Sequence, residues 1–197
     1  MPFHTVNIFE NLISKHFGAL YGVATDSCTH ALELSLRHDD PSHVSCPRHT
    51  YLSIPMTFIK LNLEWSWTND KWKSYYYLGN TRIVDAAVLW QKDSYISGTL
   101  MCLSFQFKKH LGIGRGGMIL TDDYSEYKLL KAMSYDGRSD DMPWAEQDID
   151  SIGYHYYMTP ESADYGIQKF NEVKDIEPRV WTDQDYPDLS RLKVFQQ

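Results

Sequence analysis

The sequence predicts an α/β fold with a mostly parallel sheet flanked by helices. Short apolar runs that are typical of buried strands alternate along the chain with segments whose apolar residues recur at helical spacing. The 197 residues, of which 43% are hydrophobic, are enough to bury roughly 70% of the surface that the unfolded chain exposes. The alternation of strands and helices therefore predicts a layered domain with a substantial core.

The first half of the chain alternates between helices and strands. The predicted elements are a helix over residues 5–17 that stops at Gly18, a strand over 20–25, a helix over 29–38 capped by Asp26 and Ser27, a strand over 43–47 and a helix over 50–61. Residues 62–80 alternate like β structure around a Thr-Asn-Asp turn. We expect two short strands there.

The second half of the chain is expected to provide three more strands and two helices. They are strands over 81–87, 100–107 and 117–122, a helix over 124–134, a long polar loop over 135–151 and a last helix that opens near Thr159. The tail after residue 173 is polar and either wraps the surface or is mobile. We therefore expect an α/β domain over 1–172 and a polar C-terminal tail over 173–197.

Composition excludes several classes of partner. The formal net charge is -7 with no basic cluster, which argues against a nucleic-acid partner. No window approaches the ~18 to 20 apolar residues of a membrane span, and the first residues lack the features of a signal peptide. The three cysteines, Cys28, Cys46 and Cys102, are far apart in the sequence, which fits neither a disulfide framework nor a metal site. We expect a cytoplasmic protein without a metal or a membrane partner.

Polar residues follow several of the predicted strands, at the edge where ligands bind in such sheets. They are Ser27 and Thr29 after the first strand, Asp85 after a later one, and Ser104 and Lys109 after the next. Hydroxyl and N–H groups at a helix start hold a phosphate, a carboxylate pairs with a cationic ring nitrogen, and a lysine amine forms a Schiff base. Together they describe a site for pyridoxal 5'-phosphate (PLP), with an aromatic such as Tyr51 over its ring.

Each of these residues also has an ordinary structural interpretation. Asp85 could cap the end of a strand, and Lys109, in a Lys-Lys pair, could be a solvated surface residue. Ser27 and Thr29 are common N-cap residues. The residues alone therefore leave both interpretations open.

Five segments carry a resemblance to a known family. They are DSCTHALELSL (26–36), CPRHTYLS (46–53), VDAA (84–87), SFQFKKHLGIGRGGMILTDD (104–123) and IGYHYYMTPESADYGIQKF (152–170). In this order they resemble the motifs of the DegT/DnrJ/EryC1/StrS sugar aminotransferases, which are PLP-dependent enzymes of fold type I. The resemblance implies the large PLP-binding domain of that fold, with the C-terminal small domain missing or vestigial.

The resemblance also implies an activity and a set of site residues. The expected function is a PLP-dependent aminotransferase that acts on a nucleotide-activated keto-sugar, with an amino acid as the amine donor. Lys109 matches the Schiff-base lysine, Asp85 the aspartate under the pyridine nitrogen, and Tyr51 the aromatic that stacks on the ring. The phosphate ligands are implied at Ser104, Ser27, Thr29 and the backbone amide of His30. His155 matches an asparagine that reaches the phosphate of the neighbouring subunit, so a homodimer with composite sites is expected.

Departures from the family pattern leave two alternatives. Cys28, Val88, Arg115 and Tyr157 each replace a different family residue, and the interval between Tyr51 and Asp85 is shorter than in the family. One alternative is a sugar dehydratase-like enzyme of the same family, in which a one-residue shift would place His110 at the lysine position. The other is a truncated, non-catalytic binding protein that keeps the fold.

Overall fold

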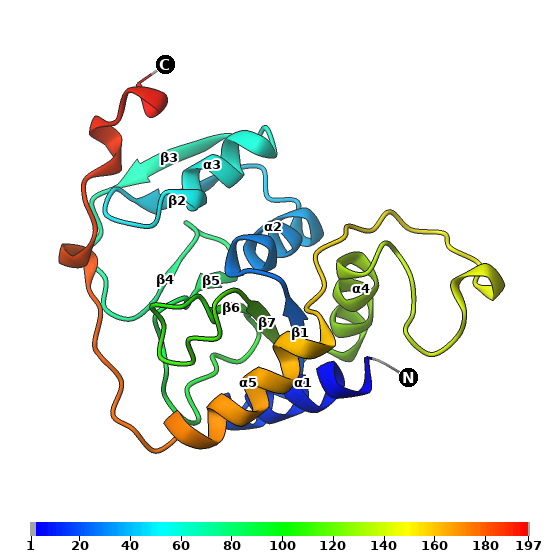
Figure 1. Ribbon diagram of the computed structural model, residues 1–197. Coiled ribbons are helices and arrows are strands. Elements are labelled where there is room, and N and C mark those ends of the chain that lie inside the picture. Colours follow the sequence, from blue (N-terminus) through cyan, green and yellow to red (C-terminus); the bar gives the residue numbers. More distant parts are fainter. Residues whose placement is uncertain (1–2, 197) are drawn as a thin grey trace.

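A five-stranded mixed sheet lies at the centre of the computed structural model, which describes residues 3–196 (Figure 1). Its strand order is β1 (Tyr21–Thr25), β7 (Gly117–Thr121), β6 (Leu100–Ser104), β5 (Ile83–Asp85) and β4 (Tyr76–Tyr77). Only β5 and β6 are parallel neighbours, and the other three pairs are antiparallel. The predicted α/β class is confirmed, but the prediction of a mostly parallel sheet is wrong for this sheet.

The connection between β6 and β7 explains the difference. Parallel neighbours need a crossover that usually contains a helix. Residues 105–116 contain no helix and lead the chain straight back, so that Ser104 pairs with Gly117 at the turn. Strand β7 is therefore antiparallel to β6, and also to β1 on its other side.

A second, two-stranded sheet is parallel. Strand β2 (Val44–Pro47) pairs with β3 (Trp65–Thr68), and the crossover between them contains α3 (Ser53–Lys60). The two strands expected within residues 62–80 are thus present as β3 and β4, but they belong to different sheets.

Helices cover both faces of the central sheet. Helices α1 (His4–Phe17) and α5 (Pro160–Val173) pack side by side on one face, and α2 (Cys28–Asp39) and α4 (Tyr124–Ser134) lie on the other (Figure 1). Alternate residues of β7 enter the two cores. Met118 and Leu120 pack with α1 and α5, and Ile119 packs with α2 and α4. This period of two is the reason that strands buried on both faces read as continuous apolar runs.

Local signals fix the ends of the helices. Gly18 adopts a left-handed conformation (φ 83°) and closes α1 by donating to the Lys15 carbonyl. The N-caps of α2, α4 and α5 are Ser27, Asp123 and Thr159, each of which accepts a hydrogen bond from a backbone amide of the first turn. The stop at Gly18, the Ser27 cap and the last helix near Thr159 are therefore confirmed.

The C-terminal segment runs back across the molecule from α5 to the second sheet (Figure 1). Its amides and carbonyls bond to two loops: Ser74 donates to the Trp181 carbonyl (2.9 Å), Asp183 to the Trp72 carbonyl and Leu189 to the Arg48 carbonyl. The described part of the tail therefore wraps the surface. The domain division at residue 172 stays a prediction, and residues 1, 2 and 197 of its ranges lie outside the described residues. Within residues 3–196, no helix is long and apolar enough to cross a membrane.

Gly117 lets β7 approach the turn that begins α2. A Cβ atom at this position would lie 2.4 Å from the Cys28 amide nitrogen and 2.4 Å from the Ser27 carbonyl carbon. Both contacts are with backbone, which cannot rotate away. The absence of a side chain at Gly117 therefore sets the position of the 26–29 turn.

We predict that Gly117→Ala lowers the free energy of unfolding by about 2–3 kcal/mol, the upper part of the range for overpacking. Gly22→Ala on the neighbouring strand β1 is the matched control, because its Cβ would chiefly meet the flexible Met118 side chain. Urea unfolding of both variants should show the larger loss for Gly117→Ala. Equal losses would contradict the close approach of β7 to the turn.

Candidate functional site

A cavity of about 590 Å³ opens where β5, β6 and the N-terminus of α2 meet. Six of the eight residues predicted for the site line it: Ser27, Thr29, Tyr51, Asp85, Ser104 and Lys109. Asp85 and Ser104 are together because the parallel strands β5 and β6 end at the same edge of the sheet. The volume falls within the range of pockets that bind small molecules.

Asp85 is a buried carboxylate at the end of β5, with only 5% of its surface exposed. The Tyr76 hydroxyl donates to Oδ2 (2.5 Å) and the Ala87 amide donates to Oδ1 (3.0 Å). The Tyr76 hydroxyl is in turn hydrogen-bonded to Thr50. Burial raises the pKa of Asp85 above its ordinary value, and the hydrogen bond from Tyr76 opposes this shift. Each carboxylate oxygen keeps a further lone pair for a ligand that donates a proton.

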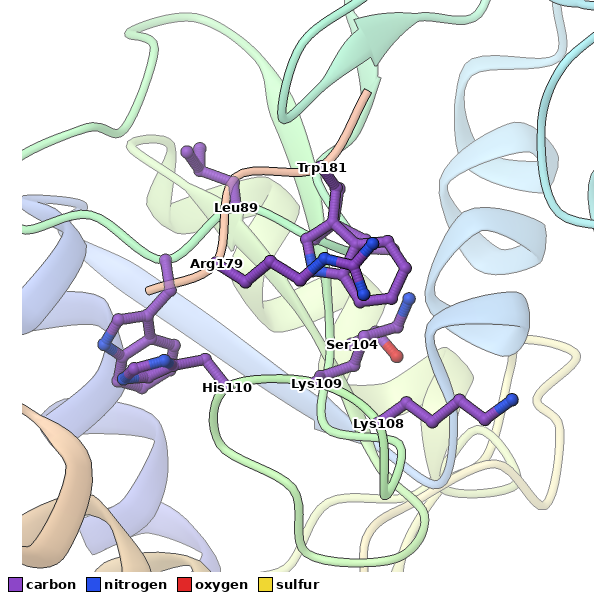
Figure 2. Close-up of a pocket in the computed structure, with 10 residues that line it drawn as sticks. Leu89, Ser104, Lys108, Lys109, His110, Arg179 and Trp181 are labelled. Carbon is purple, nitrogen blue, oxygen red and sulfur yellow. The ribbon is translucent and has the colours of Figure 1, made fainter. Parts of the chain in front are cut away.

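Lys109 lies in the loop after β6, and its amine is in the same cavity as Asp85. Burial lowers the pKa of Lys109, and the charge of Asp85 acts in the opposite direction. Its Nζ lies 5.4 Å from the centre of the Trp181 ring, whereas the neighbouring Lys108 extends in a different direction (Figure 2). A lysine with a lowered pKa has a larger neutral fraction at neutral pH, which is the form that attacks a carbonyl.

The N-terminus of α2 forms the end of the cavity that is suited to an anion. Ser27 accepts a hydrogen bond from the His30 amide (3.3 Å), and the Thr29 hydroxyl donates to Ser53 (2.8 Å). The free amides of the first helical turn and the helix dipole favour a phosphate here. Cys28 belongs to this first turn without a positive φ, and its thiol points to the Cys102 carbonyl (3.8 Å). Cys28, one of the departures from the family pattern, therefore needs no left-handed backbone.

Two predicted residues do not line the cavity. The His30 ring stacks on Tyr156 (3.6 Å between ring centres) and bonds to Asp26 (2.5 Å), so only the His30 backbone faces the turn that begins α2. The His155 side chain is 69% exposed and bonds to Asp136 (3.0 Å). Within this chain, the His155 side chain therefore lies outside the cavity and faces solvent.

The structure adds residues that the sequence motifs did not indicate. Tyr76 holds Asp85, and Trp181 and Tyr186 from the C-terminal segment form part of the wall. Tyr76 is the middle of three consecutive tyrosines. Only its position on β4, opposite Asp85 on β5, distinguishes it from the other two. The sequence contained no indication that Trp181 and Tyr186 belong to the site, because the C-terminal segment that contains them is polar overall.

The residues that line this cavity fit PLP. A buried carboxylate can face the pyridine nitrogen, a lysine amine can reach the aldehyde, and a helix N-terminus can hold the phosphate. Tyr51, 57% exposed at the rim, is placed to cover a ring. Among residues 3–196, no group of three or more His, Cys, Asp or Glu side chains is placed to hold a metal ion.

A comparison with protein families supports the interpretation of this cavity as a PLP site. Residues 92–180, somewhat less than half of the chain, match the model of the DegT/DnrJ/EryC1/StrS aminotransferase family. The match includes Lys109 and Ser104, and it confirms the resemblance to this family that the sequence motifs indicated. A comparison with curated protein sequences gives no match.

Solved structures share the fold. AtS13 from Actinomadura melliaura has a TM-score of 0.74 at 17% identity, covering 87% of this chain and 60% of its own. For the sugar aminotransferase CalS13 from Micromonospora echinospora, the TM-score is 0.73 at 15% identity, with 87% and 61% covered. The PLP form of Spr1654 from Streptococcus pneumoniae gives 0.71 at 18% identity, with 86% and 59% covered. The chain thus spans about 60% of the length of these structures, and the predicted fold class is confirmed.

The raised pKa of Asp85 predicts how stability changes with pH. Because the folded protein holds this proton above the ordinary pKa of 3.8, it binds more protons than the unfolded chain between the two pKa values. Asp85 therefore makes the free energy of unfolding fall as the pH rises from 3.8 through the folded-state pKa. Tyr76→Phe removes a hydrogen-bond donor to the carboxylate and should therefore extend this fall to higher pH. Near pH 7 the variant should lose about 1–3 kcal/mol of the free energy of unfolding.

Urea unfolding between about pH 4 and pH 8 measures this dependence. Tyr75→Phe is the matched control, since Tyr75 is 38% exposed and does not line the Asp85 cavity. In Asp85→Asn, the part of the pH dependence that Asp85 contributes should disappear. A Tyr76→Phe profile identical to that of Tyr75→Phe would refute the role assigned to the Tyr76 hydroxyl.

Proposed function

We propose that this chain forms the cofactor-binding part of a PLP-dependent aminotransferase that transfers an amino group to a nucleotide-activated keto-sugar. The observation that carries the proposal is the convergence of Asp85, Lys109 and the N-terminus of α2 on one cavity. No structural role explains all three. A strand cap needs no lysine nearby, and a solvated surface lysine would not be half-buried beside a buried carboxylate.

Each group has a distinct task in this proposal. Bound PLP supplies an electron sink for the carbanion that forms when an amino acid loses its α-proton. Asp85 holds a proton on the pyridine nitrogen, and Tyr76 keeps the carboxylate oriented. Lys109 would hold the cofactor through its amine, and the same amine would be the base that moves the proton of the amino acid's α-carbon. Ser27, Thr29, Ser104 and the amides of the α2 turn hold the phosphate.

The surroundings of His110 argue against the dehydratase-like alternative. Its Nε2 bonds to the Val173 carbonyl (2.9 Å), and its ring stacks on Trp90 at 5.2 Å. His110 is not among the residues that line the larger cavity with Asp85, whereas Lys109 is. This arrangement supports lysine at the reactive position.

We also propose that two copies of the chain form a homodimer with composite sites. The support is the resemblance at His155 together with the exposure of its side chain, which hydrogen-bonds to Asp136 and packs against the Tyr157 ring. In this arrangement the His155 imidazole of one copy donates to the phosphate held by the α2 turn of the other.

Lys109→Ala should abolish the covalent attachment of pyridoxal phosphate and leave the fold intact, because Lys109 lies at the mouth of the sheet. The wild-type protein mixed with pyridoxal phosphate should absorb between about 400 and 430 nm, and borohydride should fix the label to the protein. Lys108→Ala is the control and should keep the label. Equal labelling of the Lys109→Ala protein would overturn the assignment. The absence of labelling in the wild type would favour the non-catalytic binding protein.

His155→Ala should weaken the retention of pyridoxal phosphate, but Lys109 should still form the covalent adduct that borohydride fixes. Sedimentation should show a dimer for the wild type, and dialysis should release the cofactor faster from the variant. His43→Ala is a control at another histidine with an exposed hydrogen bond. A stable monomer that retains the cofactor would contradict the composite site.

A further inference from the structure

A second pocket, of about 320 Å³, adjoins the cavity of Asp85 and shares Ser104, Lys108, Lys109 and Trp181 with it (Figure 2). Its lining is cationic: Lys108, Lys109 and Arg179 contribute to it, and none of its lining residues is an aspartate or glutamate. The pocket is therefore locally cationic, although the chain carries a net charge of -7. A pocket of this charge favours an anionic ligand.

Arg179 is held in place at the entrance of this pocket. Its guanidinium carbon lies 3.9 Å from the centre of the Trp181 ring, and its Nη2 pairs with Asp185. The Trp181 backbone is anchored, because its carbonyl accepts a hydrogen bond from the Ser74 amide (2.9 Å), and the Trp181 ring packs against Tyr186. The pair with Asp185 involves one of the guanidinium nitrogens, and a guanidinium has five N–H donors. Arg179 therefore keeps donors in a fixed orientation for a ligand.

The cations around Lys109 point to different ends of the site. Figure 2 shows Arg179 lying along Trp181 on one side of Lys109, while Lys108 extends away from Arg179. Lys108 and Arg115 both line the larger cavity, as does the phosphate-binding turn of α2. Arg179 lines only the smaller pocket of the two. The two pockets thus offer separate places for two anions, with the reactive lysine between them.

We propose that Arg179 binds the α-carboxylate of the amino acid that donates the amine. This inference rests on the proposed function, and it assigns the donor's subsite to the C-terminal segment of this chain. A planar guanidinium binds a carboxylate through two parallel hydrogen bonds, which fixes the orientation of the amino acid. The volume of about 320 Å³ lies at the lower end of the range for small-molecule pockets. It suits an amino acid better than a nucleoside diphosphate sugar.

The test is the affinity for L-glutamate as the probe, measured by isothermal titration calorimetry. Arg179→Gln should raise the Kd by about 10- to 100-fold, the effect of losing a hydrogen-bonded charge. Arg179→Lys, which keeps the charge but not the planar fork, should give a smaller increase. Arg191→Gln is the matched control: Arg191 belongs to the same segment, is 84% exposed and lies outside both pockets. It should bind L-glutamate like the wild type.

Two further probes identify the anion. With 4-aminobutyrate, which lacks the α-carboxylate, Arg179→Gln and the wild type should have the same weak affinity. With uridine diphosphate, Arg179→Gln should also leave the affinity unchanged. An unchanged Kd for L-glutamate in Arg179→Gln, no binding of L-glutamate to the wild type, or a loss confined to uridine diphosphate would each overturn the proposal.

Labelling by pyridoxal phosphate separates this inference from the proposed function. Because Arg179 does not line the larger cavity, Arg179→Gln should form the borohydride-fixed adduct to the same extent as the wild type. Normal labelling with unchanged affinity for L-glutamate would contradict the role of Arg179 alone. Absence of labelling in the wild type would instead contradict the proposed function.

Discussion

The burial of the Asp85 carboxylate is the constraint around which the site is built. A charged carboxylate is strongly disfavoured in a protein interior unless hydrogen bonds or an opposite charge compensate for the lost water. Tyr76 and the Ala87 amide provide two hydrogen bonds, and the charge of Lys109 also stabilises the ionised form. The same burial lowers the pKa of Lys109. A ligand with a protonated ring nitrogen would stabilise the carboxylate, and an aldehyde would react with the neutral amine.

The mixed sheet places these groups without the parallel topology that the sequence suggested. The one parallel pair, β5 and β6, is the pair that brings Asp85 and Ser104 to the same edge. The antiparallel return of β7 places Gly117 against the turn that begins α2, so the end of the cavity proposed to hold a phosphate depends on a position without a side chain. The C-terminal segment then closes the other side with Trp181, far from these elements in sequence.

The sequence predicts the elements and most of the site because both depend on local signals. Apolar runs located the strands, the cap at Ser27 located α2, and the resemblance to the family motifs implied that Asp85 and Lys109 belong to one site. Strand direction was mispredicted because periodicity does not record which way a strand runs. Tyr76 was missed because only cross-strand register separates it from Tyr75 and Tyr77. Contacts between residues that are far apart in the sequence, such as those of the C-terminal segment, leave no local pattern in the sequence.

The central claim is that Lys109 is the lysine that faces Asp85 and binds the cofactor. Peptide mapping by mass spectrometry, after pyridoxal phosphate has been reduced onto the wild-type protein with borohydride, tests it most directly. The account predicts one stoichiometric label on Lys109 and none on Lys108, although the two are adjacent in sequence. A label on Lys108, or labels spread over several surface lysines, would contradict it.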